Sequence, residues 1–359
     1  MSVRELSGAD EEALLERAQS GDEAAYEQIV GVHRAELHAH CYRMLASVHD
    51  ADDAVQEALI RAWRGLAQFE SRSSLRTWLY RIATNTSFDV LKKRKRRRLA
   101  VDYGRRAGPG ESPGELLLDA PWLEPYPDAM LEDARLSPEA RYEARESLEL
   151  AFVAAIQYVP PRQRAVLILR EVLDFSAIDV SELLDMSVAA VNSSLQRARA
   201  SLVDRLPVTS QQRELQRLGV ERVDDLARRY ANAIDNGDIE SLVAMLTDDA
   251  TWSMPPHRRW YQGRAAIAEF HADSVSGERW RHLATRANGQ LAIGCYTFDD
   301  ARGCFVGSVL DILTLRDGQI ASVSAFIAPE LLRRSGLDID QDGGLVDFLR
   351  FGLPLELAE

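Results

Sequence analysis

The residues from Ser74 to Arg98, SLRTWLYRIATNTSFDVLKKRKRRR, most constrain what this chain can fold into. Apolar side chains recur there at intervals of three and four, which fits the 3.6-residue helical turn and excludes the two-residue alternation of a strand. The apolar positions are Leu75, Trp78, Leu79, Ile82, Ala83, Thr86 and Val90. The sequence therefore predicts an amphipathic helix whose apolar face, including Trp78, packs in a core.

The other face of this helix is polar, and its end is strongly basic. That face carries Arg76, Tyr80, Arg81, Asn85 and Asp89, and seven cations follow from Lys92 to Arg98. Such a surface suits nucleic acid, because cations neutralise phosphates and release counterions while polar and aromatic groups engage bases. The alternative is a solvated helix end that forms salt bridges. We favour nucleic acid because no acidic residue alternates with the basic run.

Two neighbouring stretches resemble bacterial sigma-70-type factors, specifically the small extracytoplasmic-function group. SSLRTWLYRIATN followed by the basic run is similar to their promoter-reading helix. DADDAVQEALIRAWRGLAQF, from Asp50 to Phe69, is similar to the helix with which they hold RNA polymerase. Two matches in the right order are more specific than a lone basic patch. The resemblance implies that core RNA polymerase and promoter DNA, at its −10 and −35 elements, are the partners.

The polymerase-binding stretch is itself predicted to be a helix with a buried stripe. By resemblance, its outward face docks on the polymerase, and the alternative is a plain surface face. The candidate polymerase-binding residues are Asp53, Gln56, Glu57, Arg61 and Arg64. The loop FESRSS that follows resembles the pocket for a base flipped out of the −10 element, which is read at modest unstacking cost. The candidate −10 DNA-binding residues are Arg72, Ser73, Arg76, Tyr80, Arg81, Asn85, Lys92 and Lys93.

Helical periodicity fails after Arg98. The segment GRRAGPGESP and three further prolines predict a linker. Within it, WLEPYPD places Trp122, Tyr126 and Asp128. Exposed aromatic side chains are not expected in a linker without a partner, so we expect Trp122 and Tyr126 to dock on something. WLEPYPD also resembles the linker signature of sigma factors that carry an extra C-terminal domain, which implies that these three residues are regulatory.

A second helical segment runs from Ser147 to Leu206. Ser176 and Ser187 are predicted N-caps, and Asp185 lies in the turn between two short helices, where it tolerates a left-handed conformation. FSAIDVSELLDMSVAAVNSSLQRARASL resembles the −35-reading helix-turn-helix of the same family, whose second helix enters a major groove. The candidate DNA-binding residues are Ala189, Asn192, Ser193, Gln196, Arg197 and Arg199. Asn192 and Ser194 stand where many members have Lys and Arg, which weakens the expected −35 contacts; the alternative is a helical hairpin without a DNA role.

In the last third of the chain, the sequence pattern becomes typical of β-strands. Asn288-Gly289 and Asp317-Gly318 are hairpin signals between four predicted strands, which follow three helices. Helices followed by an antiparallel meander predict an α+β cone, in which a curved sheet wraps helices. DATWSMPPHRRWYQGRAAIAEF gives this part a resemblance to the ketosteroid-isomerase-like, or SnoaL-like, domain.

Fold alone does not make the cone an enzyme. Asp311, in an otherwise apolar strand, is the best candidate for a general base, but no second group pairs with it convincingly, so we interpret it as a hydrogen-bonded structural residue. A small-ligand pocket and a filled core are both open interpretations of the aromatic residues nearby. The candidate pocket residues are Trp252, Trp260, Tyr261 and Asp311.

Composition limits the remaining options. The net charge of −13 repels DNA from the protein as a whole, so DNA binding must be local or arranged by a partner. Cys41, Cys295 and Cys304 lack metal-ligand spacing, and His33, His38 and His40 point in different directions on one helix, so we expect no metal and no cofactor. Cys295 and Cys304 face each other across a hairpin or are two buried thiols. No export signal or membrane span is expected, which predicts a cytoplasmic protein.

The sequence thus predicts a multidomain chain of two all-α sigma helical domains, the second a helix-turn-helix, plus a C-terminal α+β cone. The expected boundaries are 10–100 for polymerase binding and −10 recognition, 101–144 for the linker, 145–206 for the helix-turn-helix, 219–330 for the cone and 331–359 for an apolar tail that docks on a domain surface. The predicted function is that of an alternative sigma factor modulated by its cone. The rivals are a ligand-sensing one-component helix-turn-helix regulator, which binds duplex DNA alone, and an enzyme whose sigma-like half is degenerate.

Overall fold

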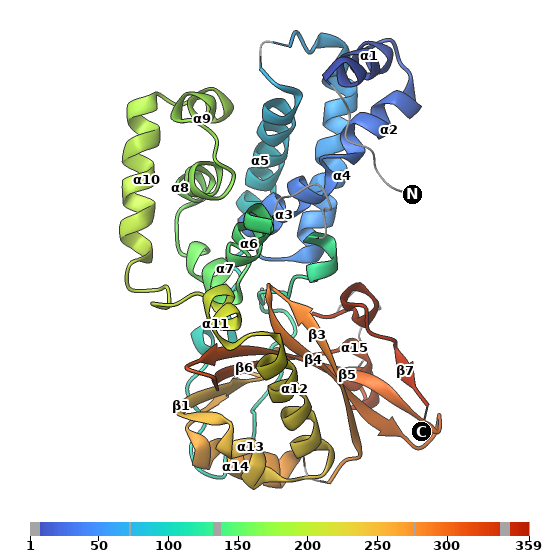
Figure 1. Ribbon diagram of the computed structural model, residues 1–359, viewed down its shortest axis with the longest axis vertical. Coiled ribbons are helices and arrows are strands. Elements are labelled where there is room, and N and C mark those ends of the chain that lie inside the picture. Colours follow the sequence, from blue (N-terminus) through green and yellow to red (C-terminus); the bar gives the residue numbers. More distant parts are fainter. Residues whose placement is uncertain (1–7, 72, 132–137, 276, 338–344, 359) are drawn as a thin grey trace. The chain divides into compact units, whose positions relative to one another are not determined.

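The computed structural model describes residues 8–71, 73–131, 138–275, 277–337 and 345–358 (Figure 1). The chain forms two compact units, and each unit is built from two separate segments. The helical unit comprises Met1–Arg97 and Met130–Leu206, and the cone unit comprises Arg98–Ala129 and Pro207–Glu359. The two helical segments, expected as separate domains, therefore share one unit. The expected linker, 101–144, is divided between the two units near residue 130.

The helical unit is built from ten α-helices of the described residues and short helical turns between them. The helices are α1 (Gly8–Gln19), α2 (Glu23–Gly31), α3 (Arg34–Leu45), α4 (Val48–Gly65), α5 (Leu75–Lys93), α6 (Pro138–Glu146), α7 (Leu150–Ile156), α8 (Pro161–Leu167), α9 (Ala177–Leu184) and α10 (Val188–Leu202), and the turns include η1 (Leu66–Gln68) and the π-helical η4 (Ile168–Val172). Side-chain caps start several of them, because a hydroxyl or carboxylate oxygen accepts a free N–H of the first turn. Ser74 caps α5 through the N–H of Thr77, and Ser47 caps α4 through that of Asp50.

Helix α5 is buried over more of its surface than the sequence predicted. Leu75, Leu79 and Ala83 lie in the core as expected, whereas Trp78 is only half-buried, with its ring 4.9 Å from that of Phe69. Thr84 and Ser87 are buried as well. Both hydroxyls face α3, since Thr84 pairs with His40 and Ser87 donates to the Cys41 sulfur. Small polar side chains that bond across a helix contact escape a prediction based on apolar periodicity.

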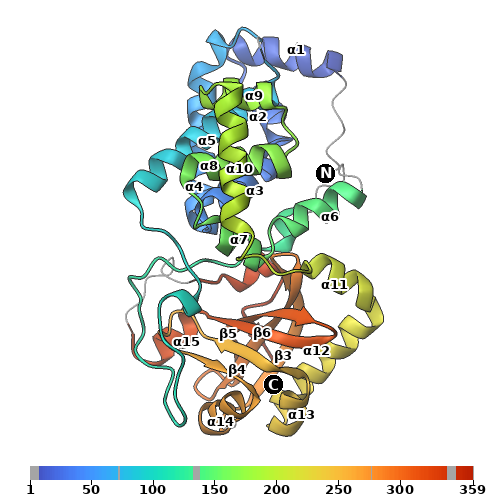
Figure 2. The ribbon, with the colours of Figure 1, turned by 90° about the vertical axis from the view of Figure 1, so that its left-hand side faces the viewer.

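The cone unit is a curved sheet with helices on one face (Figures 1 and 2). Its helices are α11 (Gln211–Leu218), α12 (Val220–Asp235), α13 (Ile239–Ala244), α14 (Arg264–Ser274) and α15 (Pro329–Arg334). Its strands are β1 (Leu246–Ser253), β2 (Trp260–Gln262), β3 (Trp280–Ala287), β4 (Gln290–Asp299), β5 (Cys304–Arg316), β6 (Gln319–Ile327) and β7 (Glu356–Leu357). The sheet order is β2-β1-β6-β5-β4-β3 with β7 on β5, and only the β1–β6 pair is parallel among the described strands. The predicted α+β cone is confirmed.

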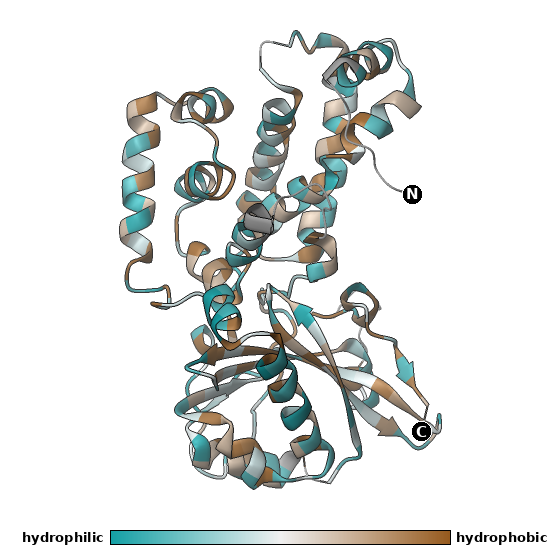
Figure 3. Ribbon diagram, in the orientation of Figure 1, coloured by the Kyte–Doolittle hydropathy of each residue, from teal (hydrophilic) through white to brown (hydrophobic). Residues whose placement is uncertain are grey.

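Both hairpin signals of the sequence form the turns that they predict. Asn288 and Gly289 have φ angles of 54° and 68°, and Asp317 and Gly318 have 53° and 79°. Positive φ at both central residues suits the right-handed twist of the strands that they join. Hydrophobic residues, brown in Figure 3, are concentrated in the central strands, and β4 is buried over most of its length, whereas β3 is largely exposed. Cys295 and Cys304 do not face each other, because Cys295 lies opposite Val309 and Cys304 opposite Asp299.

The apolar tail docks on the sheet of the cone unit, with Phe348 and Leu353 buried. Two glycines make room for it. A Cβ on Gly307 would lie 2.8 Å from the Phe348 ring, and one on Gly294 would lie 2.5 Å from a Leu353 methyl carbon. Contacts this short require glycine, since Cβ atoms do not come so close to a neighbour. Among the described residues, no helix combines the length and apolar character needed to span a membrane.

One buried histidine should make the helical unit sensitive to acid. His40 lies on α3 with its Nε2 atom 2.9 Å from the Thr84 hydroxyl. Burial, together with the charge of Arg43, lowers the pKa of His40 from 6.5 to about 3. The folded state stays neutral while the unfolded chain takes up a proton below pH 6.5, so the stability contributed by neutral His40 is present above that pH and is lost as the pH falls toward 3.

We expect the unfolding free energy of the helical unit to fall by about 2 kcal/mol, because of His40, when the pH is lowered from 7.5 to 5. Urea unfolding of the His40→Gln variant should therefore show a weaker pH dependence over this range than the parent protein. Met44→Leu changes a buried side chain of the same helix that does not titrate, so this control should retain the parent slope. An unchanged slope in His40→Gln would contradict the assignment.

Candidate polymerase and promoter interfaces

The outward face of α4 carries the candidate polymerase-binding residues. Asp53, Gln56, Arg61 and Arg64 are exposed, and Glu57 is half-buried. Arg61 donates to Glu57 at 2.7 Å and to Asp89 of α5 at 3.0 Å. The charged face is therefore held in position by an ion pair that reaches the neighbouring helix.

The predicted promoter-reading face of α5 is only partly open. Arg81, Asn85, Lys92 and Lys93 are exposed and Ser73 is half-buried, while Arg72 lies outside the described residues. Tyr80, predicted on this face, is fully buried. Its hydroxyl donates to Glu36 of α3 at 3.2 Å, and burial raises the pKa of Tyr80 well above its ordinary value. The prediction that Tyr80 lies on an exposed face of α5 is therefore wrong, while a role of Tyr80 in DNA binding stays a prediction.

The segment before α9 covers this part of α5. The ring of Phe175 lies 5.2 Å from that of Tyr80, and the Arg76 guanidinium lies 4.8 Å from the Phe175 ring. Arg76 also donates to Glu36 at 3.1 Å. The residues of the predicted −10-reading helix thus pack directly against the predicted −35-reading region. Sequence reasoning missed Glu36 and Phe175, because neither belongs to a motif that marks a contact between the two regions.

The basic run after α5 is partly neutralised, contrary to the expectation that it lacks acidic partners. Arg94 and Arg97 contact the two carboxylate oxygens of Asp50 at 3.1 and 2.7 Å. Asp50 is buried near the start of α4. Lys92 pairs with Asp89 of the same helix at 3.0 Å. Asp50, by contrast, is distant in sequence, so alternation of charge within the run could not reveal it.

The helix-turn-helix forms as predicted in its local geometry. Ser176 and Asp179 form a capping box at the start of α9, and Asp185 takes the left-handed turn position with φ 52° and ψ 58°. Ser187 caps α10. The candidate residues Ala189, Asn192, Ser193, Gln196, Arg197 and Arg199 are all exposed on α10. Arg199 pairs with Glu171, so one cation of this surface has a counter-charge.

The linker strap, residues 98–129, belongs to the cone unit and runs along the cone in Figure 2. Its first residue meets its later part, because the Arg98 N–H donates to the Pro121 carbonyl at 3.1 Å and the Arg98 carbonyl accepts from the Leu123 N–H at 3.0 Å. Trp122 is buried at this junction, with its indole N–H on the Leu117 carbonyl at 2.8 Å and its ring 4.5 Å from that of Tyr103.

The end of the strap is fixed to the turn between β3 and β4. The Tyr126 N–H donates to the side-chain oxygen of Asn288 at 2.8 Å, and the Asn288 N–H donates to the Tyr126 carbonyl at 2.8 Å. Asp128 accepts from the Gly289 N–H at 2.7 Å. All three linker residues singled out from the sequence, Trp122, Tyr126 and Asp128, are buried. The Asn-Gly pair was recognisable as a turn, but its role as the anchor was not.

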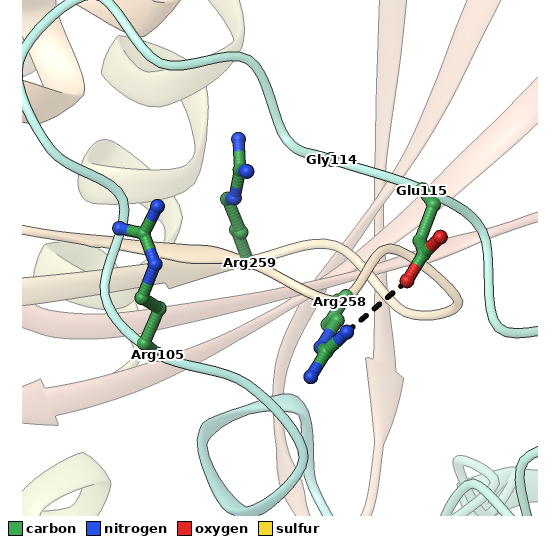
Figure 4. Close-up of a pocket in the computed structure, with 5 residues that line it drawn as sticks. All are labelled: Arg105, Gly114, Glu115, Arg258 and Arg259. Carbon is green, nitrogen blue, oxygen red and sulfur yellow. Dashed lines mark hydrogen bonds and ion pairs between the residues drawn. The ribbon is translucent and has the colours of Figure 1, made fainter.

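The middle of the strap lies on the residues around β2. The Trp260 indole donates to the Gly104 carbonyl at 3.0 Å, and the Tyr261 hydroxyl donates to the Glu111 carbonyl at 2.9 Å. A Cβ on Gly104 would lie 1.8 Å from the Arg258 carbonyl oxygen, so only glycine permits this approach. A cavity of about 460 Å³ opens beside it, lined by Arg105, Gly114, Glu115, Arg258 and Arg259. Figure 4 shows Arg258 paired with Glu115 across this cavity, at 3.1 Å.

The interior of the cone is filled by its own side chains at the positions proposed for a ligand. Trp252 and Tyr261 are buried in the core, and Trp260 is engaged by the strap. Asp311 is buried and accepts from the Tyr230 hydroxyl at 2.6 Å, with the Cys295 sulfur at 3.3 Å. Burial raises the pKa of the Asp311 carboxyl. These partners agree with the interpretation of Asp311 as a structural residue.

Three parts of the chain are similar to known protein families. Residues 29–97 match Sigma-70 region 2, residues 149–202 match Sigma-70 region 4, and residues 227–323 match a SnoaL-like domain. The ECF RNA polymerase sigma factor SigG of Mycobacterium tuberculosis is 41% identical over 311 residues, which cover 85% of this chain and 82% of SigG. The chain belongs to the ECF sigma factor family. SigW of Bacillus subtilis, also an ECF sigma factor, is 31% identical over 52% of this sigma factor and 92% of its own length.

A solved structure agrees with the fold of this sigma factor. The crystal structure of the extracytoplasmic function sigma factor SigJ of Mycobacterium tuberculosis has a TM-score of 0.54 at 21% identity, and the match covers 85% of this chain and 97% of SigJ. The sigma factor is therefore a transcription factor built from regions 2 and 4 with a fused SnoaL-like cone. The rival interpretation of the chain as a one-component regulator loses its support.

Proposed function

We propose that this sigma factor directs core RNA polymerase to promoters and that its own cone holds it in a closed arrangement until the linker strap is released. The contact between Tyr80 and Phe175, with ring centroids 5.2 Å apart, carries the proposal. It joins region 2 to region 4 on the face of α5 predicted to read the −10 element.

The distance between the −10 and −35 elements is too large for both to be read while Tyr80 and Phe175 are in contact. Elements named −10 and −35 lie roughly 85 Å apart on duplex DNA at about 3.4 Å per base pair. A compact unit of the size of the helical unit has a radius of gyration of only roughly 16 Å. Regions 2 and 4 must therefore separate before both elements are read, and the chain between them must extend.

The strap is the chain that has to extend. Fully stretched, its residues 98–129 reach roughly 110 Å at about 3.3–3.6 Å per residue, enough to span the two elements. Docked on the cone, the strap is folded back so that Arg98 pairs with Trp122, and Tyr126 near its end is fixed to Asn288. Release from the cone supplies the length that an open arrangement requires. A small ligand of the cone would act through this strap, because Trp260 and Tyr261 both contact it.

The exposed α4 face supplies the polymerase contact in this proposal, through Asp53, Gln56, Glu57, Arg61 and Arg64. Region 4 supplies −35 contacts through the exposed face of α10. Exposed Arg81, Asn85, Lys92 and Lys93 contribute −10 contacts at once, whereas Arg76 and Tyr80 become available only after region 4 moves away.

The strap anchor can be tested with matched turn variants in transcription with core polymerase. Asn288→Gly keeps a residue that accepts φ 54° but removes the side-chain acceptor of the Tyr126 N–H, which leaves a buried donor unpaired at a cost of about 1–3 kcal/mol. We expect the Asn288→Gly variant to give several-fold more promoter-specific initiation than the parent protein. Asp317→Gly makes the same change in the other hairpin, where Asp317 has a φ of 53°, and should leave initiation unchanged.

A second test in the same transcription assay removes residues 207–359. We expect polymerase-dependent initiation to persist and to increase, because the strap then has no cone to hold it. Equal initiation by the parent, Asn288→Gly and truncated proteins would contradict regulation by the cone. DNA binding without polymerase would contradict the sigma role.

A further inference from the structure

The helical unit contains a cavity of about 380 Å³ where the basic run meets the turn between α7 and α8. This volume lies within the range of small-molecule sites. Region 2 and region 4 both line it, so an occupant would contact both. The lining residues are Leu45, Asp50, Val90, Leu91, Arg94, Lys95, Arg96, Arg97, Gln157, Tyr158, Val159, Pro160, Pro161 and Arg164.

The lining has a large excess of positive charge. It includes five cationic side chains and one carboxylate, that of Asp50. Asp50 is already engaged by Arg94 and Arg97 at 3.1 and 2.7 Å. Lys95, Arg96 and Arg164 therefore have no carboxylate partner among the lining residues. In a chain with a net charge of −13, this concentration of cations is a local exception.

Arg164 is the deepest of these cations, with 3% of its surface exposed. Its terminal nitrogens donate only to uncharged oxygens, at Met44, Val159 and both the side chain and the backbone of Gln157. Its Nε atom is buried without a hydrogen-bond partner. Burial and the charge of Arg96 lower the pKa of Arg164 to about 9. A buried guanidinium with no counter-charge is costly unless an anion lies close to it.

The rim of the cavity places a second guanidinium over an aromatic ring. Arg96 lies 4.9 Å from the ring centroid of Tyr158, and Arg205 lies 4.1 Å from the same centroid. Cation–π contacts of this kind orient a guanidinium while leaving its N–H groups free to donate. The exposed Lys95 and Arg96 are thus positioned to bind an anion at the mouth, with Arg164 as a fixed charge beneath.

We propose that this cavity is a binding site for a small phosphate-bearing anion, which bridges regions 2 and 4 and stabilises the closed arrangement. Arginine is well suited to phosphate, because its fork of N–H groups matches the phosphate oxygens. A free phosphorylated metabolite fits a cavity of about 380 Å³, and a DNA backbone phosphate is the other source of the same chemistry. The proposal rests on the closed arrangement of the proposed function but does not depend on the strap.

The test is isothermal titration of the full-length protein with inorganic pyrophosphate at constant ionic strength, with chloride as the reference anion. We expect saturable binding to the parent protein and to the control Lys93→Gln, which alters the same basic run outside the lining. Lys95→Gln and Arg96→Gln should each weaken the affinity at least tenfold. Pyrophosphate should also slow hydrogen exchange in residues 157–164 of the parent.

No binding beyond that of chloride, or equal affinity in Arg96→Gln and Lys93→Gln, would overturn the site. Displacement of pyrophosphate by a short promoter duplex at the same ionic strength would assign the cavity to DNA phosphate and overturn the small-anion proposal. The isothermal titration and the hydrogen-exchange measurement require neither polymerase nor release of the strap. A failure of Asn288→Gly to change transcription would therefore leave this result unaffected, and the two proposals can fail separately.

Discussion

Replacement of Trp122 by alanine should free the linker strap and raise initiation with core polymerase more than any other single change in the cone unit. Trp122 is 2% exposed, and removal of a buried tryptophan side chain costs about 3–5 kcal/mol. The change also removes the hydrogen bond to the Leu117 carbonyl and the contact with Tyr103. Because Arg98 pairs with Trp122, loss of the indole also loosens the start of the strap, while Tyr126 and Asp128 keep their contacts with Asn288 and Gly289.

Limited trypsin digestion measures the release directly. Cleavage after Arg105 and Arg106 requires the strap to leave the cone, since the next residue, Ala107, donates its N–H to the Trp260 carbonyl at 2.8 Å. When opening is fast relative to cleavage, the rate follows the population of the open strap, so a loss of about 3 kcal/mol predicts cleavage at least roughly 100-fold faster. Leu118→Ala removes a 45% exposed side chain of the same strap and should cleave like the parent. Equal cleavage of Trp122→Ala and Leu118→Ala would refute the anchor.

Replacement of Phe175 by alanine should separate region 4 from α5 within the helical unit. Phe175 is buried against Tyr80 and lies 4.8 Å from the Arg76 guanidinium. Its loss should cost the packing of region 4 on α5 about 3–5 kcal/mol. We expect faster hydrogen exchange of residues 76–84 and higher promoter-specific initiation, because Arg76 and Tyr80 become accessible.

The control for this change is Ile178→Ala, only three residues further along. Ile178 is 63% exposed, so its truncation should leave both exchange and initiation unchanged. Circular dichroism distinguishes opening from unfolding, since an opened unit keeps its helices. Faster exchange throughout α3, α4 and α5 with loss of helical signal would show that Phe175 supports the fold and not the closed contact.

Local signals in the sequence predicted local structure well. The serine caps of α5, α9 and α10, the left-handed Asp185 and both glycine-containing hairpins formed as their chemistry dictates. Each of these features depends on residues within a few positions of one another. The cone followed from the same signals, because two-residue turns fix which strands are neighbours.

Features that join distant segments were not predictable. The sequence pattern places Tyr80 on the polar side of its helix. In the structure, however, Glu36 and Phe175 contact it, and these residues are 44 and 95 positions away along the chain. The basic run appeared unpaired because Asp50, its partner, is 47 residues from Arg97. The division of the linker between two units depends on Asn288, which is 162 residues from Tyr126. Periodicity describes one element at a time and contains no information about such partners.

The division of each unit into two separate segments has a consequence for the newly made chain. Region 2 and region 4 are complete once the ribosome passes Leu206, whereas the remainder of the cone still lies ahead. At about 5–20 residues per second, synthesis of those roughly 150 residues takes roughly 8–30 s. During that interval Tyr126 and Asp128 lack their partners, Asn288 and Gly289. If the cone restrains the sigma regions as proposed, each nascent chain passes through a stage without that restraint, and the rate of translation of the cone sets how long the stage lasts.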